Sequence, residues 1–220
     1  VDVFFVISGF LITKIILKEY QEKSFSFVNF YTRRILRIFP ALFLMLFVSF
    51  IFASLILTTK DMVWFSRSLE YSSLQISNLF FQRMVDYFDA NEGFQPLIHT
   101  WSLGVEEQFY LIMPAIVIFL LRFKSKKVTA SNEKSNTALN WAFWGIFALS
   151  LQSIVISQFL IFVNQKVAFY SLLSRFWELG IGCLLAFNRI KISPKIANNS
   201  LATNILAMTG LLLIMISSFV

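Results

Sequence analysis

Long runs of apolar residues constrain the fold of this chain more than any other feature of its sequence. A helix that crosses the hydrocarbon core of a bilayer needs about 20 mainly apolar residues. Six runs approach this length, and polar residues separate them: Val3 to Leu17, Pro40 to Leu57, Leu103 to Leu121, Trp141 to Val163, Leu172 to Phe187 and Asn204 to Val220. We therefore expect an all-α protein, a polytopic transmembrane helix bundle with about six spans.

The composition excludes most classes of soluble protein. Hydrophobic residues make up 57% of the 220 and charged residues 14%, against about 45–50% and about 25% in globular chains. Too few polar residues remain to cover a soluble domain of this size. With one cysteine, Cys183, and one histidine, the chain offers neither an internal disulfide nor the ligand set of a transition-metal site.

The stretch from Leu69 to Met84 is apolar on one side but too polar for a span. It carries Glu70, Gln75, Asn78, Gln82 and Arg83. A one-sided pattern of this kind is typical of a helix that lies at a surface, so we expect an interfacial or re-entrant helix here.

The basic residues are distributed unevenly between the two sides that these runs define. Fourteen of the 19 lie in or just before three alternate loops, Lys18 to Phe39, Arg122 to Asn140 and Arg189 to Thr203. Short loops rich in Lys and Arg stay in the cytoplasm, so we expect these three to be cytoplasmic. Topology then accounts for the net charge of +7, and nucleic acid is not expected as a partner.

Polar side chains beside apolar helices are costly and are therefore candidates for function. The densest group follows His99 and includes Glu106 and Glu107, where the third apolar run begins. If a helix starts near Thr100, its positive end favours ionised carboxylates. A carboxylate in a closed pocket can orient a histidine or bind a hydroxyl group, so His99, Glu106 and Glu107 are candidate catalytic residues.

A purely structural interpretation of the same segment stays open. Ser102 has the side chain of a helix N-cap. Trp101 and Tyr110 are residue types that anchor helices at the membrane surface. The segment would then be a well-capped helix entrance.

Three arginines form a second candidate site on the predicted cytoplasmic side. Arg33, Arg34 and Arg37 fall on one helical face just before Pro40. Guanidinium groups bind phosphate oxygens through paired hydrogen bonds, which suits a nucleotide ligand. The alternative is that these charges set the topology or contact anionic lipids.

A third group lies near the start of the fifth apolar run. Arg175 and Glu178 are three residues apart and can pair on a helix at the extracytoplasmic rim. Asp2, just before the first run, is either a helix cap or a buried partner. Gly9 and Gly182 favour close packing of helices.

Four segments in order along the chain resemble the integral-membrane acyltransferase type 3 family. They are residues 1–13 (VDVFFVISGFLIT), 30–40 (FYTRRILRIFP), 99–114 (HTWSLGVEEQFYLIMP) and 175–182 (RFWELGIG). Members of this family are O-acetyltransferases that modify lipopolysaccharide, peptidoglycan and other glycans. The resemblance covers essentially residues 1–220.

The resemblance implies a membrane O-acyltransferase, in the bacterial inner membrane, that uses acyl-CoA as donor and a glycan or glycolipid as acceptor. Acyl-CoA is then a substrate, and no bound cofactor or metal is expected. Arg33, Arg34 and Arg37 match the donor-side motif of the family. Trp101, Ser102 and Glu106 match its acceptor-side motif, and Asp2, Arg175 and Glu178 belong to the same side. Of the two carboxylates, we expect Glu106 to matter more than Glu107.

The resemblance also implies that this chain is part of a longer protein. Family members have an upstream helix with an Arg and a His, and further helices after the position of Val220. We expect an incomplete catalytic centre here. Two other functions stay open, a transporter or flippase-like protein without acyl transfer, and a structural membrane subunit.

Overall fold

The computed structural model describes residues 1–84, 95–123, 131–187, 204, 208–210 and 212 of the chain. It divides into two compact units, Val1–Ala186 and Phe187–Val220. All regular secondary structure among the described residues is helical, so the predicted all-α class is confirmed. In the second unit, the described residues 208–210 are helical.

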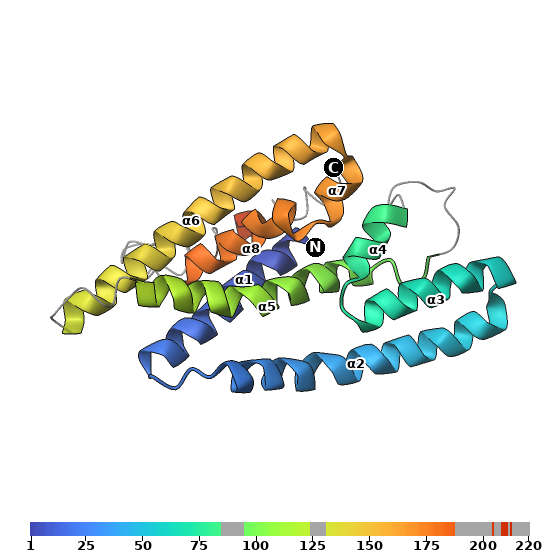
Figure 1. The fold of residues 1–220 in the computed structure, drawn as a ribbon, viewed down its shortest axis with the longest axis horizontal. Helices are drawn as coiled ribbons and strands as arrows, with labels where there is room; N and C mark the ends of the chain where they lie inside the picture. The colour runs from blue at the N-terminus through green and yellow to red at the C-terminus, as the bar shows by residue number, and fades with distance from the viewer. Residues whose placement is uncertain (85–94, 124–130, 188–203, 205–207, 211, 213–220) are drawn as a thin grey trace. The chain divides into compact units, whose positions relative to one another are not determined.

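The first unit contains eight helices in the described residues (Figure 1). They are α1 (Asp2–Gln21), α2 (Phe27–Ile56), α3 (Thr59–Ser73), α4 (Ser77–Met84), α5 (Thr100–Phe123), α6 (Ser131–Val163), α7 (Gln165–Tyr170) and α8 (Leu172–Ala186). Side chains at the N-caps fix three of the starts, because Ser26 accepts a hydrogen bond from the Asn29 amide, Thr58 from the Asp61 amide and Asn164 from the Val167 amide. Helix α8 packs against both α1 and α6, and α3 runs back along α2.

Three helices are long and apolar enough to cross a membrane, Phe27–Ile56, Thr100–Arg122 and Thr137–Val163. The expectation of about six spans was therefore too high for the described residues. Helix α1 carries three charges in its second half, Lys14, Lys18 and Glu19. Helix α8 has 15 residues and is about 22 Å long, against about 30 Å of hydrocarbon core.

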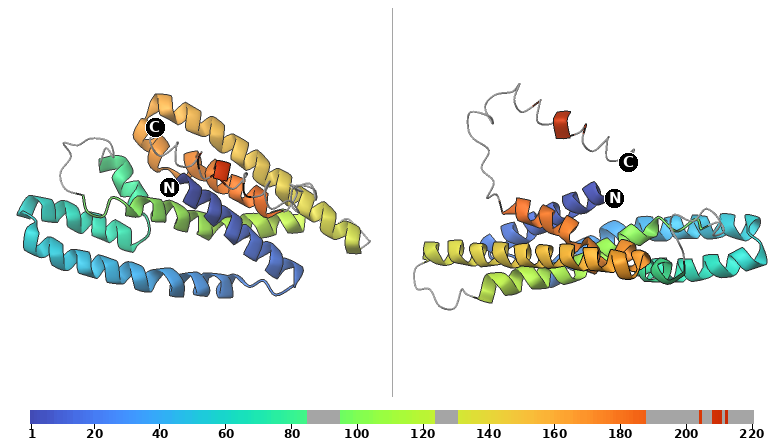
Figure 2. Two further views of the ribbon diagram at one scale, coloured as in Figure 1. Left: turned by 180° about the vertical axis from the view of Figure 1, so that it is seen from behind. Right: turned by 90° about the horizontal axis from the view of Figure 1, so that it is seen from above.

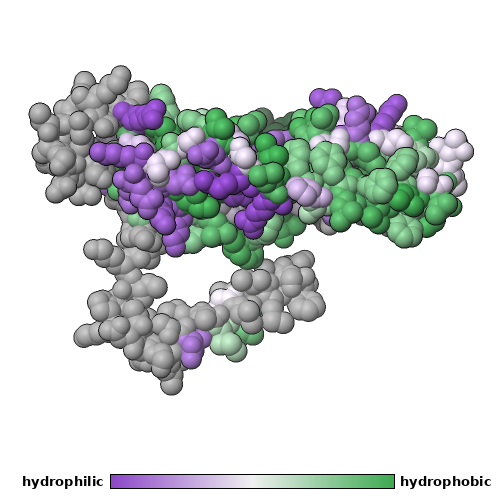
Figure 3. Space-filling model, turned by 90° about the horizontal axis from the view of Figure 1, so that it is seen from below, coloured by the Kyte–Doolittle hydropathy of each residue, from purple (hydrophilic) through white to green (hydrophobic). Residues whose placement is uncertain are grey.

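The surface and the packing explain why apolar runs outnumber the candidate spans. Hydrophobic residues cover much of the face shown in Figure 3, and hydrophilic residues gather in patches. The residues of α8 that are fully buried, among them Leu179 and Cys183, instead face other helices. A short helix inside a bundle is therefore as apolar as one that faces lipid. The sixth run, Asn204 to Val220, lies largely outside the described residues.

Two glycines allow α1 and α8 to touch through their backbones, side by side in both views of Figure 2. A Cβ atom added at Gly9 would overlap the carbonyl oxygen of Leu179, and one added at Gly182 would overlap that of Val6. The close packing predicted for these glycines is thus present. The contact also fixes the position of Ser8, which precedes Gly9 on α1.

The stretch from Leu69 to Met84 is not a single helix, because it divides between α3 and α4. Gln75 lies in the intervening turn with a φ of 61°, in the left-handed region, which ends one helix before the next begins. The turn packs on Gly104 of α5, where a Cβ atom would lie 3.0 Å from Asn78 Oδ1 and 3.3 Å from the Gln75 carbonyl oxygen. The amides of Asn78 and Gln108 also pair, at 2.8 Å. The turn is therefore fixed on the first half of α5.

Candidate functional site

Helix α5 begins at Thr100, as its sequence predicts. Ser102 lies inside the helix, and its hydroxyl donates to the carbonyl oxygen of His99 at 3.2 Å. The prediction that Ser102 is the N-cap was therefore wrong. The hydroxyl of Thr100 also donates to a preceding carbonyl, that of Leu97, at 2.7 Å.

The aromatic residues of this segment are buried and do not anchor a membrane surface. Trp101 is 3% exposed and Tyr110 is 5% exposed. The Trp101 ring contacts Phe5 of α1 and both Phe169 and Tyr170 of α7. The interpretation of Trp101 and Tyr110 as interface anchors was wrong, because neighbouring helices cover both side chains.

Glu106 is one of the most deeply buried carboxylates in the described chain, at 2% exposure. The hydroxyl of Ser8, on α1, donates a hydrogen bond to its Oε1 atom. Tyr110, one turn along α5, lies beside the same carboxyl. A neutral hydroxyl group from a neighbouring helix therefore holds this carboxyl in place. Sequence reasoning missed Ser8, although it stands beside Gly9 in the first family segment.

A pocket of about 310 Å³ lies between α2, α5 and the turn after α3. Its polar lining consists of Arg34, Gln75, Glu107 and Gln108, and most of its other walls are apolar or aromatic. We call it the Arg34–Glu107 pocket. Glu106 is not among the described residues that line it.

Arg34 reaches from α2 to the middle of α5. Its guanidinium carbon lies 4.0 Å from the centre of the Tyr110 ring, a cation–π contact. Its charge also interacts with the carboxyl groups of Glu106 and Glu107. Nearby, the Tyr31 hydroxyl donates to the carbonyl oxygen of Leu111 at 2.7 Å. One donor-motif residue and the two acidic residues thus meet at the same place, although the sequence assigned them to opposite sides of the membrane.

The other two arginines of the motif do not line this pocket. Arg33 Nη2 lies 2.5 Å from Glu19 Oε1 on α1, and Arg37 is exposed. Adjacent residues on a helix point about 100° apart, which separates Arg33 from Arg34. The structure therefore brings Arg34 alone of the three to the Arg34–Glu107 pocket.

Two buried side-chain atoms of residues that line this pocket have no hydrogen-bond partner among the described residues. They are Oε1 of Glu107 and Nε2 of Gln75. The Gln75 side chain is 8% exposed. A buried polar atom without a partner costs about 1–3 kcal/mol, so a ligand with both a donor and an acceptor would be stabilised here. Gln75 was visible in the sequence only as one polar residue of a surface helix.

Arg175 forms a separate charged cluster near the start of α8. Its Nη1 atom lies 2.7 Å from Glu178 Oε1 and 3.4 Å from Asp2 Oδ1, so the predicted Arg175–Glu178 pair is confirmed. The Asp2 side chain is 69% exposed, so Asp2 is not a buried partner. The guanidinium also donates to the Phe169 carbonyl at 3.1 Å and lies 6.0 Å from the Trp101 ring. In the described chain, this cluster shares no residue with the Arg34–Glu107 pocket.

His99 is exposed in the turn that precedes α5. Seven residues separate it from Glu106, or about 10 Å along the helix axis, and it is not among the described residues that line the pocket. The structure does not bring His99 to the carboxylates. Within the described residues, no cluster of three or more His, Cys, Asp or Glu side chains is placed to hold a metal ion.

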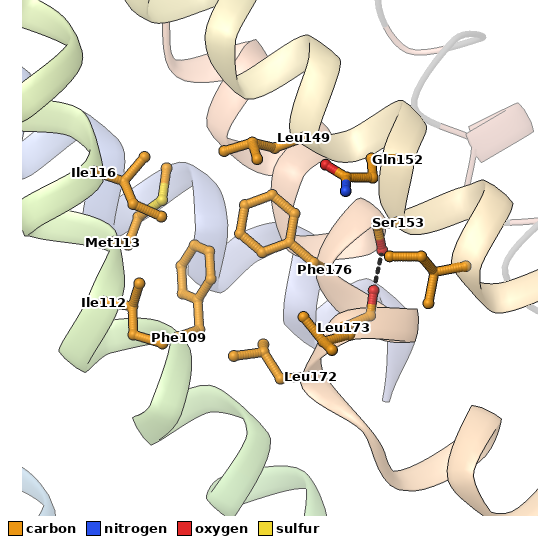
Figure 4. Close-up of a pocket in the computed structure, with 11 residues that line it drawn as sticks. Phe109, Ile112, Met113, Ile116, Leu149, Gln152, Ser153, Leu172, Leu173 and Phe176 are labelled. Carbon is orange, nitrogen blue, oxygen red and sulfur yellow. Dashed lines mark hydrogen bonds between the residues drawn. The ribbon is translucent and has the colours of Figure 1, made fainter. Parts of the chain in front are cut away.

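A second cavity, of about 200 Å³, lies between α5, α6 and α8 (Figure 4). Phe109 and Met113 of α5 face Phe176 of α8 across it. Its polar lining residues are Gln152 and Ser153, and the Ser153 hydroxyl already donates to a backbone carbonyl at 2.7 Å. Without a charged side chain among its described lining residues, this cavity is suited to apolar contacts and not to acid–base chemistry.

Comparison with known proteins identifies the family. The family model described as an acyltransferase domain matches residues 1–220. The chain belongs to this acyltransferase family. The resemblance predicted from the four sequence segments, to the integral-membrane acyltransferase type 3 family, is thereby confirmed.

Two relatives differ in how much of their length this chain covers. An uncharacterized protein of Haemophilus influenzae is 38% identical over 222 residues, which cover 97% of this chain and 84% of the relative. The O-acetyltransferase OatA of Staphylococcus aureus is 32% identical over 190 residues, which cover 85% of this chain and 29% of OatA. The chain thus spans less than a third of OatA. No solved structure matches it.

Proposed function

We propose that the protein is an O-acetyltransferase of the bacterial inner membrane that moves an acetyl group from acetyl-CoA to a hydroxyl of a cell-envelope glycan. Membership of the acyltransferase family supports acyl transfer. The relative named O-acetyltransferase OatA supports acetyl as the group and a hydroxyl as its acceptor. Three helices that could cross a membrane support a membrane location.

The Arg34–Glu107 pocket is the observation that carries this proposal. It combines a guanidinium, a carboxylate with an unpartnered oxygen and a carboxamide with an unpartnered nitrogen, among walls that are mostly apolar or aromatic. Arg34 provides the positive charge that an anionic donor requires. Arg37, exposed three residues further along α2, is available for the phosphates of coenzyme A.

Glu107 is the better placed of the two carboxylates to meet a substrate. Its Oε1 atom has no partner in the described chain, whereas the carboxyl of Glu106 is held by Ser8. We assign Glu107 as the base that accepts the proton of the acceptor hydroxyl. Glu106 then acts as a positioning residue for Tyr110, whose ring supports Arg34. The sequence by itself instead favoured Glu106 over Glu107 as the catalytic carboxylate.

The test is the amount of base-labile acetate on the cell envelope. Cells that express the full-length protein should carry more ester-linked acetate than cells without it, and Glu107→Gln should remove the excess while the protein level stays unchanged. Asp61→Asn, a change in an exposed N-terminal turn of α3, is the control and should keep it. A glycan that moves across the membrane without gaining acetate would instead support the transporter hypothesis.

A further inference from the structure

The turn between α3 and α4 places an unusual side chain in the Arg34–Glu107 pocket. Gln75 is nine-tenths buried, yet its Nε2 atom lacks a hydrogen-bond partner among the described residues. Its backbone is in the left-handed region, with a φ of 61°, where residues other than Gly, Asn and Asp are uncommon. Two unfavourable features therefore coincide at one residue that lines the pocket.

Packing holds the turn in this position. The backbone amide of Gln75 donates to the Ser72 carbonyl at 3.1 Å. Ser77, two residues later, donates to the Thr100 carbonyl at 2.8 Å, and the Asn78 amide donates to the Tyr170 carbonyl at 3.1 Å. The side chain of Gln75 itself contributes none of these bonds. A role confined to forming the turn therefore does not require a carboxamide.

We propose that Gln75 is a catalytic residue that donates a hydrogen bond to the carbonyl oxygen of the acyl group during transfer. This inference rests on the proposed function and adds a second catalytic group to it. Acyl transfer requires a group that accepts the hydroxyl proton and a group that donates to the carbonyl oxygen, where negative charge develops. The two unpartnered atoms of the pocket, Glu107 Oε1 and Gln75 Nε2, provide one of each.

The reaction balances with these groups. The hydroxyl oxygen of the acceptor forms a bond to the thioester carbon, and its proton passes to Glu107. The electron pair of the carbonyl moves onto oxygen, where Gln75 Nε2–H stabilises it. The electron pair then returns from the oxygen to re-form the carbonyl, and the carbon–sulfur bond breaks. The sulfur leaves as coenzyme A and takes the proton from Glu107, which yields the ester and a free thiol.

Substitution by glycine separates this role from a structural one. Glycine adopts a positive φ more readily than glutamine, so Gln75→Gly should preserve or stabilise the turn while it removes the carboxamide. Lys23→Gly is the matched control, because Lys23 also has a positive φ, of 55°, and lies in the turn between α1 and α2. Gln75→Asn keeps an amide and tolerates the same backbone, but its side chain is shorter by one methylene.

The experiment uses the full-length protein in nanodiscs with acetyl-CoA labelled with ¹³C at the carbonyl. Isotope-edited infrared spectroscopy measures the carbonyl band of the bound donor, and calorimetry measures its Kd. In the wild type, the band should lie at lower frequency than that of free acetyl-CoA. In Gln75→Gly, the band should return towards the free value, with a Kd changed by no more than about tenfold. In cells that express Gln75→Gly, deposition of base-labile acetate should be lower than with the wild type by about 100-fold or more.

The outcomes distinguish this inference from the proposed function. A wild type that does not bind acetyl-CoA overturns the donor assignment and the role of Gln75 with it. Binding with an identical carbonyl band in the wild type and Gln75→Gly overturns the role of Gln75 and leaves the donor assignment standing. Deposition of acetate by Gln75→Gly as fast as by Lys23→Gly would also overturn the role of Gln75 and leave the donor assignment standing.

Discussion

Replacement of Arg34 by alanine should weaken the binding of acetyl-CoA far more than it affects insertion of the protein into the membrane. The guanidinium lies 4.0 Å from the centre of the Tyr110 ring and lines the Arg34–Glu107 pocket. A hydrogen bond to a charged group contributes about 1.5–3 kcal/mol, which corresponds to an increase in Kd of roughly 10- to 150-fold. Calorimetry on the full-length protein in nanodiscs measures this change directly.

Two other arginines provide the comparison. Arg33 pairs with Glu19, and its side chain is 55% exposed. It is not among the described residues that line the pocket, and an exposed charge contributes about 0.2–1 kcal/mol to an interaction, so Arg33→Ala should change the Kd by less than about fivefold. Arg67 lies over Trp64 at 5.9 Å, on α3, and Arg67→Ala should leave the Kd unchanged. A normal Kd in Arg34→Ala, together with inverted or poorly inserted protein, would show that Arg34 sets topology and does not bind the donor.

Three further results are expected. Glu107→Gln should lower acetyl transfer by about 100-fold or more, and Glu106→Gln by less; the opposite order in base-labile acetate would return the catalytic assignment to Glu106. In a Cys183→Ser background, a cysteine at Ser24 should resist an impermeant thiol reagent in intact cells, because the loop that contains it is predicted to be cytoplasmic; labelling there would contradict the topology. Gly9→Leu should reduce the yield of folded protein in detergent, since the added side chain would collide with the backbone of α8, and a normal yield would argue against the close contact.

Local patterns were enough to predict several features correctly. The helical class, the start of α5 at Thr100 and the Arg175–Glu178 pair all follow from the spacing of residues close together in the chain. The same is true of the four segments that indicate the family. The break at Gln75 was missed, because glutamine gives no local signal for a positive φ.

The tertiary structure decided which residues lie next to one another. The sequence placed Arg34 and Glu107 in separate motifs and grouped Arg34 with Arg33, but α2 carries Arg34 to the middle of α5 and leaves Arg33 with Glu19. Apolar periodicity reports how much of a helix is buried, and it does not distinguish burial by lipid from burial by other helices. For that reason the sequence alone determined the helical class and the chemical groups available, whereas packing between helices distant in the chain decided which of those groups share a pocket and which apolar helices are buried by other helices.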